Sequence, residues 1–371
     1  MNKEMTRRVP GWWWPPVVAV FLLSAPWPSG LVDTFYSRGI YRYGQSFMTT
    51  ISNLTPWTWM DVLAVVVLAL VLRRIVLLIK DARSDGFLAA SGQLMRRSLR
   101  AAGVVLGIFC LFWGLNYRRT PLGQALIAAQ TSAPAPAASV DDLRSLAVDA
   151  ANLAARTRGN ARQALLSYED VAQALPGPFN DALGRLGRPR LSVPGRPKYT
   201  VFTPFFTRAG VTGMVDPFAL ESLVHPDLLP FERPFVLAHE WAHLAGFADE
   251  AEASAIGWSA CMRGDAPLVN SASMFLFAEA GASLPRPVWN TVLASTDAGV
   301  LEDLHALDQR LRAVEPRVRD ASFKVYDEYL KANSVPDGVH SYSRSLQLIM
   351  LPVFRDQLNG LRFDRVGPGR R

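Results

Sequence analysis

Residues 234–254 read PFVLAHEWAHLAGFADEAEAS, and the first part of this stretch has the character of a buried helix. Proline is tolerated in the first turn of a helix, and Gly246 stands where a helix commonly ends. On such a helix His239 and His243 are four residues apart, so their imidazoles project from one face. The flanking side chains are mostly apolar, as expected of a helix that excludes bulk water. We therefore expect a helix over 234–245 that brings two imidazoles together inside the protein.

Two neutral imidazoles on one face suit Zn²⁺, which in catalytic sites takes a third protein ligand and keeps one position for water. Glu240 adjoins the first histidine, and its carboxylate is placed to take a proton from that water and pass it to a leaving amine. The chain has five histidines, so two of them around a glutamate at this spacing are an uncommon coincidence. The alternative is a pair of inert, hydrogen-bonded histidines. The pattern favours His239 and His243 as zinc ligands and Glu240 as the general base.

The cysteines and the net charge narrow the choice of metal and partner. Cys110 and Cys261 are the only cysteines and lie far apart, so a metal here must be held by nitrogen and oxygen. The net charge of +7 comes largely from basic residues that flank apolar segments, where they act as topology signals. No nucleic-acid recognition module is visible, so we expect no nucleic-acid partner. We make no prediction of oligomeric state.

The apolar residues concentrate before residue 120. Half of all residues are hydrophobic and the mean hydropathy is slightly positive. Three segments, at about 9–27, 57–79 and 101–117, come close to the roughly 20 residues that cross a bilayer as a helix. The first also fits a signal peptide, but the residues around Ala25 make a poor cleavage site, so we favour an uncleaved anchor.

Basic residues set the expected topology. Residues 1–8 carry three of them and the stretch from Arg73 to Arg100 carries seven, which predicts a cytoplasmic position for both. An aromatic-rich loop at 29–56 and everything after Tyr117 then face outward. We expect a multi-pass protein of the bacterial inner membrane, in contact with the lipid bilayer. Its parts would be a membrane domain (1–119), a Pro/Ala linker (120–140) and a periplasmic domain (141–371).

The outer domain is expected to be mainly helical with a small sheet. Apolar residues recur at helical spacing after Ser139, and a second helix is predicted over 160–175. Short strands are predicted at 199–203 and 210–215, between prolines and glycines. His225 and His305 have no spacing relation to the motif and are expected at the surface. The predicted fold class is mainly α, with transmembrane helices followed by a zincin-like α+β domain that carries the HExxH helix.

Three acids after Gly246 compete as the third ligand. Zincins with a glutamate ligand often present it on the next helix, four residues before a group that supports a metal histidine. Glu250 fits this register, with Ser254 in the supporting position. Asp249 falls where the zincin group written HExxHxxGxx(H/D) has its ligand, and Met262 or Met274 would have to supply the methionine turn of that group. Glu252 is the third possibility, and Glu250 is our first choice.

Four stretches resemble a bacterial family catalogued as a domain of unknown function. They are WGLNYR at 113–118, GVTGMVDPF at 210–218 with Glu221, residues 239–253, and YDEYLK at 326–331 with GVHSY at 338–342. The similarity covers nearly the whole chain after the first helix and implies a zinc-peptidase-like fold. The run EAEAS at 250–254 is also similar to the Glu-x-x-Ala-Asp element of membrane-bound prenyl-protein endopeptidases, which favours Glu250 as the ligand.

Peptide hydrolysis also needs a donor to the oxyanion that forms at the carbonyl. Tyr342 is our first choice, with His340, Arg344 and Tyr329 as alternatives. Residues 214–218 are expected to form either an edge strand that pairs with an extended peptide or an ordinary structural strand. The sequence thus predicts a membrane-anchored zinc metallopeptidase that acts on an extracytoplasmic peptide or protein. The alternative is a non-catalytic membrane sensor or assembly factor with a structural or relic zinc site.

Overall fold

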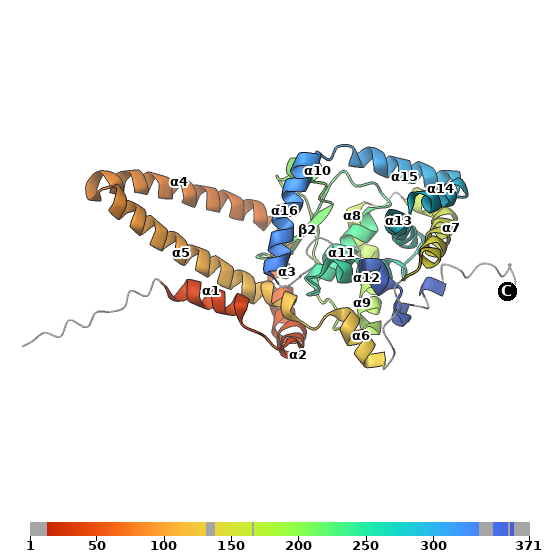
Figure 1. Cartoon of the computed structure of the whole chain (residues 1–371), viewed down its shortest axis with the longest axis horizontal. Coiled ribbons are helices and arrows are strands. Elements are labelled where there is room, and N and C mark those ends of the chain that lie inside the picture. The colour runs from red at the N-terminus through yellow and green to blue at the C-terminus, as the bar shows by residue number, and fades with distance from the viewer. Residues whose placement is uncertain (1–12, 131–137, 165–166, 334–343, 355–356, 360–371) are drawn as a thin grey trace, which may run out of the picture.

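The computed structural model describes residues 13–130, 138–164, 167–333, 344–354 and 357–359. These residues are mainly helical and carry one small sheet (Figure 1). The helices are α1 (Trp14–Ser24), α2 (Ser29–Leu31), η1 (Val32–Ile40), α3 (Tyr41–Asn53), α4 (Trp59–Asp85), α5 (Phe87–Phe112), η2 (Gly114–Arg118), α6 (Leu122–Gln130), α7 (Val140–Ala164), α8 (Tyr168–Ala174), α9 (Pro176–Arg185), α10 (Thr203–Ala209), α11 (Arg233–Leu244), α12 (Glu250–Cys261), α13 (Ala266–Ser283), α14 (Arg286–Ala294), α15 (Ala298–Leu311), α16 (Pro316–Ala332), α17 (Ser345–Ile349) and η4 (Pro352–Phe354).

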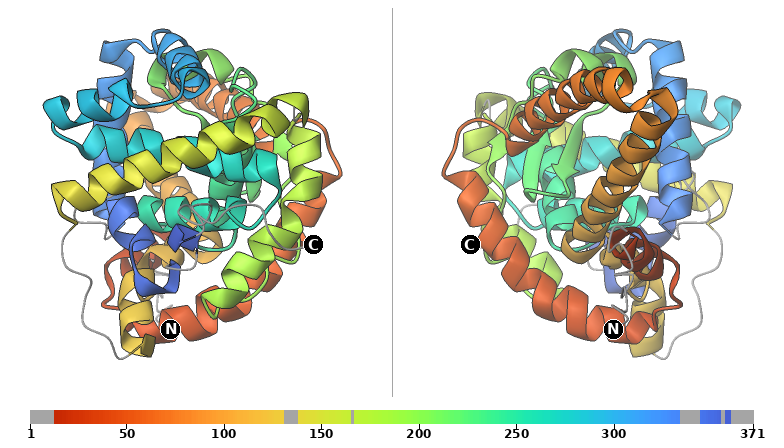
Figure 2. Two further views of the ribbon diagram at one scale, coloured as in Figure 1. Left: turned by 90° about the vertical axis from the view of Figure 1, so that its right-hand side faces the viewer. Right: turned by 90° about the vertical axis from the view of Figure 1, so that its left-hand side faces the viewer.

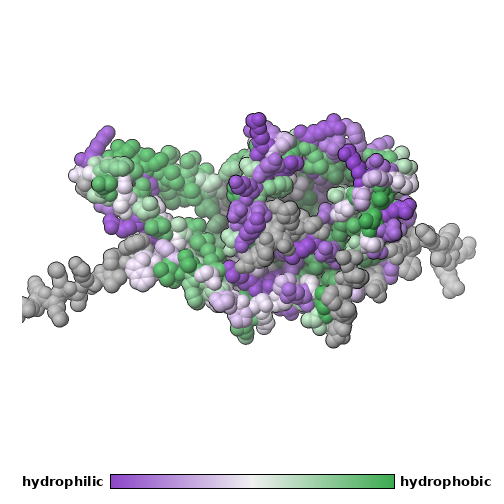
Figure 3. Space-filling model, viewed as in Figure 1, coloured by the Kyte–Doolittle hydropathy of each residue, from purple (hydrophilic) through white to green (hydrophobic). Residues whose placement is uncertain are grey.

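Helices α4 and α5 form a long hairpin that projects from the globular part, and α1 lies along α5 (Figure 1). The hairpin turns at Gly86, whose φ of 84° is a conformation that glycine adopts without steric cost. A Cβ atom at Gly103 would overlap the backbone of Pro16, so this glycine lets α1 approach α5 closely. Apolar side chains cover most of the hairpin surface, and polar ones gather near its tip (Figure 3).

The structure supports the three predicted membrane spans only in part. Among the described residues, Trp59–Ser84 is the one helix long and apolar enough to cross a membrane, and it is not buried by the rest of the chain. A second span exists if α1 and Ser29–Asn53, which are bent by 103° from each other, count as one. The predicted third segment, 101–117, overlaps the second half of α5, which begins at Phe87 and ends at Phe112. Helix α5 contains Arg96, Arg97 and Arg100 near its middle, which makes it too polar to qualify.

Residues 29–56, predicted to be an outer loop, are mostly helical and pack against the globular part. Tyr41, Gln45 and Thr49 lie on one face of α3 at intervals of four residues and are buried. Their side chains donate to backbone carbonyls of Leu244, Val193 and Leu220 at 3.0, 2.8 and 2.8 Å. The buried face of α3 consists mostly of polar residues, so the periodicity of apolar residues does not predict this helix.

The segment 120–140, predicted to be a linker, contains helix α6. Leu122 at its start is fully buried, and its N–H donates to the buried Glu252 carboxylate. Phe109 and Trp113, from before residue 119, belong to the same hydrophobic core as Leu122. The chain therefore stays packed against the core across the predicted domain boundary.

The sheet has three strands in the order β1-β3-β2. Strand β3 (Glu221–Val224) is fully buried and pairs in parallel with β1 (Pro197–Lys198) and antiparallel with β2 (Gly213–Asp216). The predicted strand at 210–215 is confirmed as β2. The one predicted at 199–203 is wrong: the chain turns there, and α10 begins at Thr203 with a proline in its first turn. Strand β2 lies at the edge of the sheet and contacts α11.

The globular part is built around α11 and α12, which pack against each other beneath α7 and α13 (Figure 2). The helix predicted after Ser139 is confirmed as α7. The one predicted at 160–175 is instead the end of α7 followed by α8, which starts at a capping box made by Ser167 and Asp170. The predicted helix over 234–245 is confirmed as α11. Trp241 anchors it by donating from its indole N–H to the Gly195 carbonyl at 2.9 Å.

Candidate metal centre

Three nitrogen and oxygen atoms converge between α11 and α12. His239 Nε2 and His243 Nε2 are 3.1 Å apart, as expected for imidazoles one turn apart on a helix. Glu250 Oε2 lies 3.1 Å from His239 Nε2 and 3.4 Å from His243 Nε2. Within the described ranges this is the one group of three or more histidine, cysteine or carboxylate side chains close enough together to share a metal ion.

A tight turn between the two helices brings Glu250 to the histidines. Gly246 has a φ of 87°, and the following Phe247 N–H closes the end of α11 on the Ala242 carbonyl at 3.1 Å. Asp249 then caps α12 by accepting from the backbone N–H groups of Ala251 and Glu252. Gly257 allows the helices to approach closely, because a Cβ there would lie 3.0 Å from the backbone nitrogen of His239.

The atoms that face away from the centre are held by neighbouring oxygens. His243 Nδ1 lies 2.7 Å from the Phe247 carbonyl, and His239 Nδ1 lies 3.3 Å from the Ser254 hydroxyl. The Tyr326 hydroxyl donates to Glu250 Oε1. A carbonyl partner fixes the proton on Nδ1 and leaves the Nε2 lone pair free for a ligand. The supporting position predicted for Ser254 is thus occupied as expected.

Glu240 is buried beside this cluster without belonging to it. Its exposed fraction is 3%, and its Oε2 atom has no hydrogen-bond partner among the described residues. Burial raises the pKa of Glu240 to about 8. A Cβ atom at Gly213 on β2 would overlap this carboxylate, so strand and carboxylate lie in direct contact. A buried carboxyl oxygen without a partner is costly, which points to a role outside stability.

The donor set fits zinc. Two imidazole nitrogens and one carboxylate oxygen are ligands that Zn²⁺ takes in catalytic sites. Burial alone would raise the pKa of Glu250, but the two imidazoles outweigh it and hold that pKa well below its usual value. The carboxylate is therefore kept ionised, as metal binding requires.

The two alternative third ligands are engaged elsewhere. Besides capping α12, Asp249 forms an ion pair with Arg344 at 2.7 Å. Glu252 pairs with the buried Arg119 and accepts the Leu122 N–H. Neither carboxylate belongs to the group of side chains around the histidines. Asp249 and Glu252 stabilise the packing of the chain, and Glu250 is the carboxylate that lies beside His239 and His243. Met262 ends α12 and Met274 lies inside α13, so Met274 cannot form a turn.

The structure tests the predicted oxyanion donors only in part. Tyr342 and His340 lie outside the described residues. Arg344 is bound to Asp249, and the Tyr329 hydroxyl bonds to that of Tyr117 at 3.3 Å. Sequence reasoning missed the contact of Tyr326 with Glu250. The rings of Tyr326 and Tyr329, which are three residues apart on α16, stack with centroids 5.8 Å apart beside Glu250. The spacing of the two tyrosines is visible in the sequence, but it does not indicate that α16 packs against α12.

Of the remaining histidines, one was placed wrongly. His225 was predicted at the surface but is buried, with Nε2 at 2.8 Å from the Thr207 hydroxyl and Nδ1 accepting the Asp227 N–H. Both ring nitrogens are thus used locally. His305 is exposed, as predicted, and bonds to Gln309.

The foot of the projecting hairpin forms a wall of the site. The Trp113 ring packs edge-on against His243 with centroids 6.2 Å apart. Phe109 contacts Tyr329 edge-on and Phe218 in a tilted arrangement. Phe109 and Trp113 come from the last turn of α5 and the residue that follows it, so the foot of the hairpin packs directly against the histidine cluster.

The profile of the family described as "Protein of unknown function (DUF3810)" matches residues 36–350. The match covers most of the chain, and the chain therefore belongs to this family. It contains α3, the hairpin, the sheet and the whole metal cluster. No curated protein and no solved structure matches the chain.

Proposed function

We propose that the chain is a membrane-anchored, zinc-dependent metallopeptidase that hydrolyses peptide bonds of an extracytoplasmic protein or peptide. The observation that carries the proposal is the convergence of His239, His243 and Glu250 beside Glu240, a buried carboxylate with an unpartnered oxygen. Structural zinc sites usually have four protein ligands, whereas catalytic sites have three and an open position. The three donors found among the described residues fit the second kind, in a zincin-like arrangement.

The chemistry divides between the metal and the chain. When bound, Zn²⁺ supplies a Lewis acid that activates water and polarises a carbonyl. Glu240 accepts the proton of the attacking water through its free Oε2 and later donates it to the leaving amine. Burial raises the pKa of Glu240, which strengthens its carboxylate as a base toward the proton of the water. Ser254, Phe247 and Tyr326 hold the ligands in place and do not react.

Strand β2 is the proposed docking edge for the substrate. Its inner edge pairs with β3, and within the described sheet its other edge is free for an extended peptide. Gly213 touches Glu240, so a peptide paired with β2 would run past the base and the metal ligands. Because Gly213 has no side chain, β2 can lie directly against the Glu240 carboxylate.

The hairpin is the proposed membrane anchor. The apolar side chains of α4 are exposed along its length, which suits lipid and is unfavourable in water. Lys80 and Arg83 lie near the hairpin tip, and the positive-inside rule places such residues in the cytoplasm. The globular part, at the opposite end, would then lie in the periplasm of a bacterial cell.

The test compares wild type with Glu240→Gln in the purified full chain. Both should hold about one zinc per chain, because Glu240 is not a ligand. Cleavage of a mixed peptide library, followed by mass spectrometry, should fall by about 10²-fold or more in the variant, because an amide cannot accept the proton. Glu328→Gln, on an exposed part of α16, is the matched control and should cleave like wild type. Equal cleavage by Glu240→Gln and wild type would refute the enzymatic proposal and favour a structural zinc site.

A further inference from the structure

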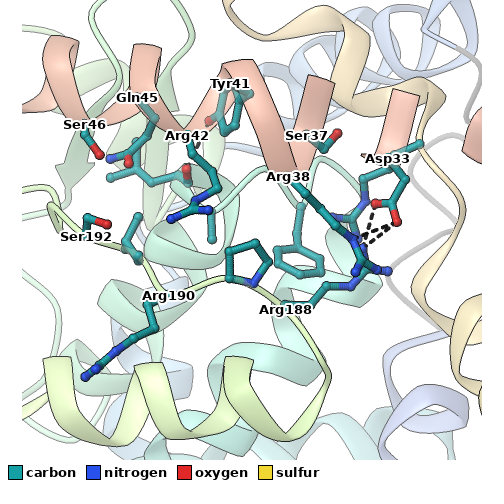
Figure 4. Close-up of a pocket in the computed structure, with 16 residues that line it drawn as sticks. Asp33, Ser37, Arg38, Tyr41, Arg42, Gln45, Ser46, Arg188, Arg190 and Ser192 are labelled. Atoms are coloured by element: carbon teal, nitrogen blue, oxygen red, sulfur yellow. Dashed lines mark hydrogen bonds and ion pairs between the residues drawn. The ribbon is translucent and has the colours of Figure 1, made fainter. Parts of the chain in front are cut away.

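A pocket opens between η1, α3 and the segment 188–192, next to the end of α11 (Figure 4). It lies apart from the metal ligands but shares Leu244, Ala245 and Phe247 with the helix end that carries His243. The proposed peptidase chemistry makes no use of it.

Positive charge dominates the lining. Five arginines and one carboxylate, that of Asp33, line the pocket. Asp33 is shared by Arg188 at 2.6 Å and Arg38 at 3.1 Å, and Arg119 is neutralised by Glu252 from outside the lining. Five positive charges against two carboxylates leave an excess of three. The lining arginines are Arg38, Arg42, Arg119, Arg188 and Arg190.

Two of these arginines have hydrogen-bond donors left over inside the protein. The Arg188 side chain is only 3% exposed, and while its Nη1 binds Asp33, its Nε and Nη2 have no partner among the described residues. The Nε atom of Arg42 is likewise buried and unpartnered in the described structure. Burial and the neighbouring Arg119 lower the pKa of Arg188. A buried guanidinium with free donors is costly unless an anion completes it.

We propose that this pocket binds the phosphate group of an anionic phospholipid. Guanidinium forks match the oxygens of phosphate and form paired, charge-assisted hydrogen bonds with them. Arg42 reaches from α3 toward the segment 188–192, and Arg188 lies beside Asp33, while the Arg190 side chain points away from Arg42 (Figure 4). A phosphate in the pocket would offer acceptors to the unpartnered donors of Arg42 and Arg188 and would offset the excess charge.

The outer face of α3 favours a lipid as the source of that phosphate. Ile40, Tyr43, Phe47 and Leu54 follow one another at intervals of three, four and seven residues and are 72%, 74%, 65% and 78% exposed. They lie opposite the face on which Tyr41 and Gln45 pack into the core. An amphipathic helix of this kind lies in the plane of a membrane surface with its apolar face in the lipid.

The position of α3 agrees with this. The segment 29–53 is bent by 103° from α1, and α3 runs around the edge of the globular part, crosswise to the projecting hairpin (Figure 2, right). If the hairpin spans a bilayer, α3 lies along its surface. Arg42 and Ser46 are on the flank of α3 between its apolar and packed faces, at the level expected for headgroups.

The experiment uses the full chain, metal-free, in a neutral detergent. Melting temperature and native mass spectrometry report binding of three probes: phosphatidylglycerol, phosphatidylcholine of the same chain length, and inorganic phosphate. Arg42→Gln/Arg190→Gln removes one half-buried and one exposed arginine of the pocket and spares the Arg188–Asp33 pair, so the variant is expected to fold. Arg185→Gln/Arg196→Gln removes two exposed arginines outside the lining and is the matched control.

Phosphatidylglycerol should bind wild type and the control alike, and about tenfold more weakly to the pocket variant, because charge-assisted hydrogen bonds are lost. Phosphatidylcholine, which carries a compensating positive charge, should bind more weakly to all. If inorganic phosphate binds wild type and the control but not the pocket variant, the pocket is an anion site. Its ligand would then be a soluble phosphate compound and not a lipid. Binding of phosphatidylglycerol that is equal in the pocket variant and the control overturns the proposal. Because the protein is metal-free, this result is independent of peptidase activity.

Discussion

The metal cluster and the arginine pocket share the end of helix α11, yet they differ in how their polar atoms are paired. In the metal cluster every atom that faces away from the centre has a partner, as with His243 Nδ1 and Glu250 Oε1. In the pocket, Arg188 and Arg42 keep donors without partners among the described residues. Side chains that are held in place by hydrogen bonds to their outer atoms suit a single small ion bound to their inner atoms. Free guanidinium donors suit a larger ligand that brings its own oxygens.

The largest effect is expected from the loss of a proposed metal ligand. This change tests whether the cluster of His239, His243 and Glu250 binds zinc. Glu250→Ala removes one of three donors, so zinc content measured by atomic emission should fall from about one per chain to near zero at micromolar zinc. Peptide cleavage should be lost with it.

Asp249→Asn is the control for that change. The amide keeps an oxygen that can cap α12, so zinc content should remain near that of wild type. If Asp249→Asn loses zinc while Glu250→Ala keeps it, the ligands have been assigned in the wrong order. Asp249 would then be the third ligand, and Glu250 would serve the packing of the chain.

Glu252→Ala is expected to act on stability. It leaves Arg119 buried without its carboxylate and the Leu122 N–H without its acceptor. Breaking a buried ion pair in this way costs about 3–5 kcal/mol. The melting temperature should fall well below that of wild type, while the folded fraction keeps its zinc. A variant that melts like wild type but releases zinc would make Glu252 part of the metal site.

The convergence of His239, His243 and Glu250 could be predicted from the sequence because the three residues are close together in the chain. His239, His243 and Glu250 lie within one helix, a tight turn and the start of the next helix, so helical spacing alone brings them together. Ser254 follows by the same geometry. Tyr326, more than seventy residues away, could not be assigned, because no local rule connects α16 to α12.

The arginine pocket could not be predicted from the sequence, because its residues come from segments that are far apart in the chain. Arg42, Arg119 and Arg188 come from three separate segments, and nothing in the sequence around them predicts that they meet. The helix α3 was also missed, since its buried face carries Gln45 and Thr49 in place of apolar residues. Patterns of apolar residues predict elements that pack by hydrophobic contact, and α3 is held by side-chain hydrogen bonds to backbone carbonyls.

Tyr326→Phe tests whether the hydrogen bond from Tyr326 to Glu250 strengthens zinc binding. The variant keeps the ring and its stacking on Tyr329 but loses the hydrogen bond to Glu250. Zinc affinity, measured by competition with a chelator, should fall by about tenfold, as is typical when a partner of a metal ligand is removed. Tyr329→Phe removes a hydroxyl that bonds to Tyr117 and not to Glu250, so it should leave zinc affinity unchanged. Equal affinities for both variants would show that Tyr326 does not position Glu250.

Gly213→Ala is the smallest change and probes the contact between the strand and the general base. The added methyl group would overlap the Glu240 carboxylate, so either β2 or the carboxylate must shift. A shift of the base by a fraction of an ångström should lower kcat by about tenfold, because proton transfer depends on hydrogen-bond reach. Zinc content should stay constant, since no ligand moves.

Gly184→Ala is the matched control, because a Cβ there meets nothing within 4 Å, and it should be indistinguishable from wild type. If Gly213→Ala retains full kcat and zinc, β2 is an ordinary structural strand, and the substrate must reach Glu240 from another side.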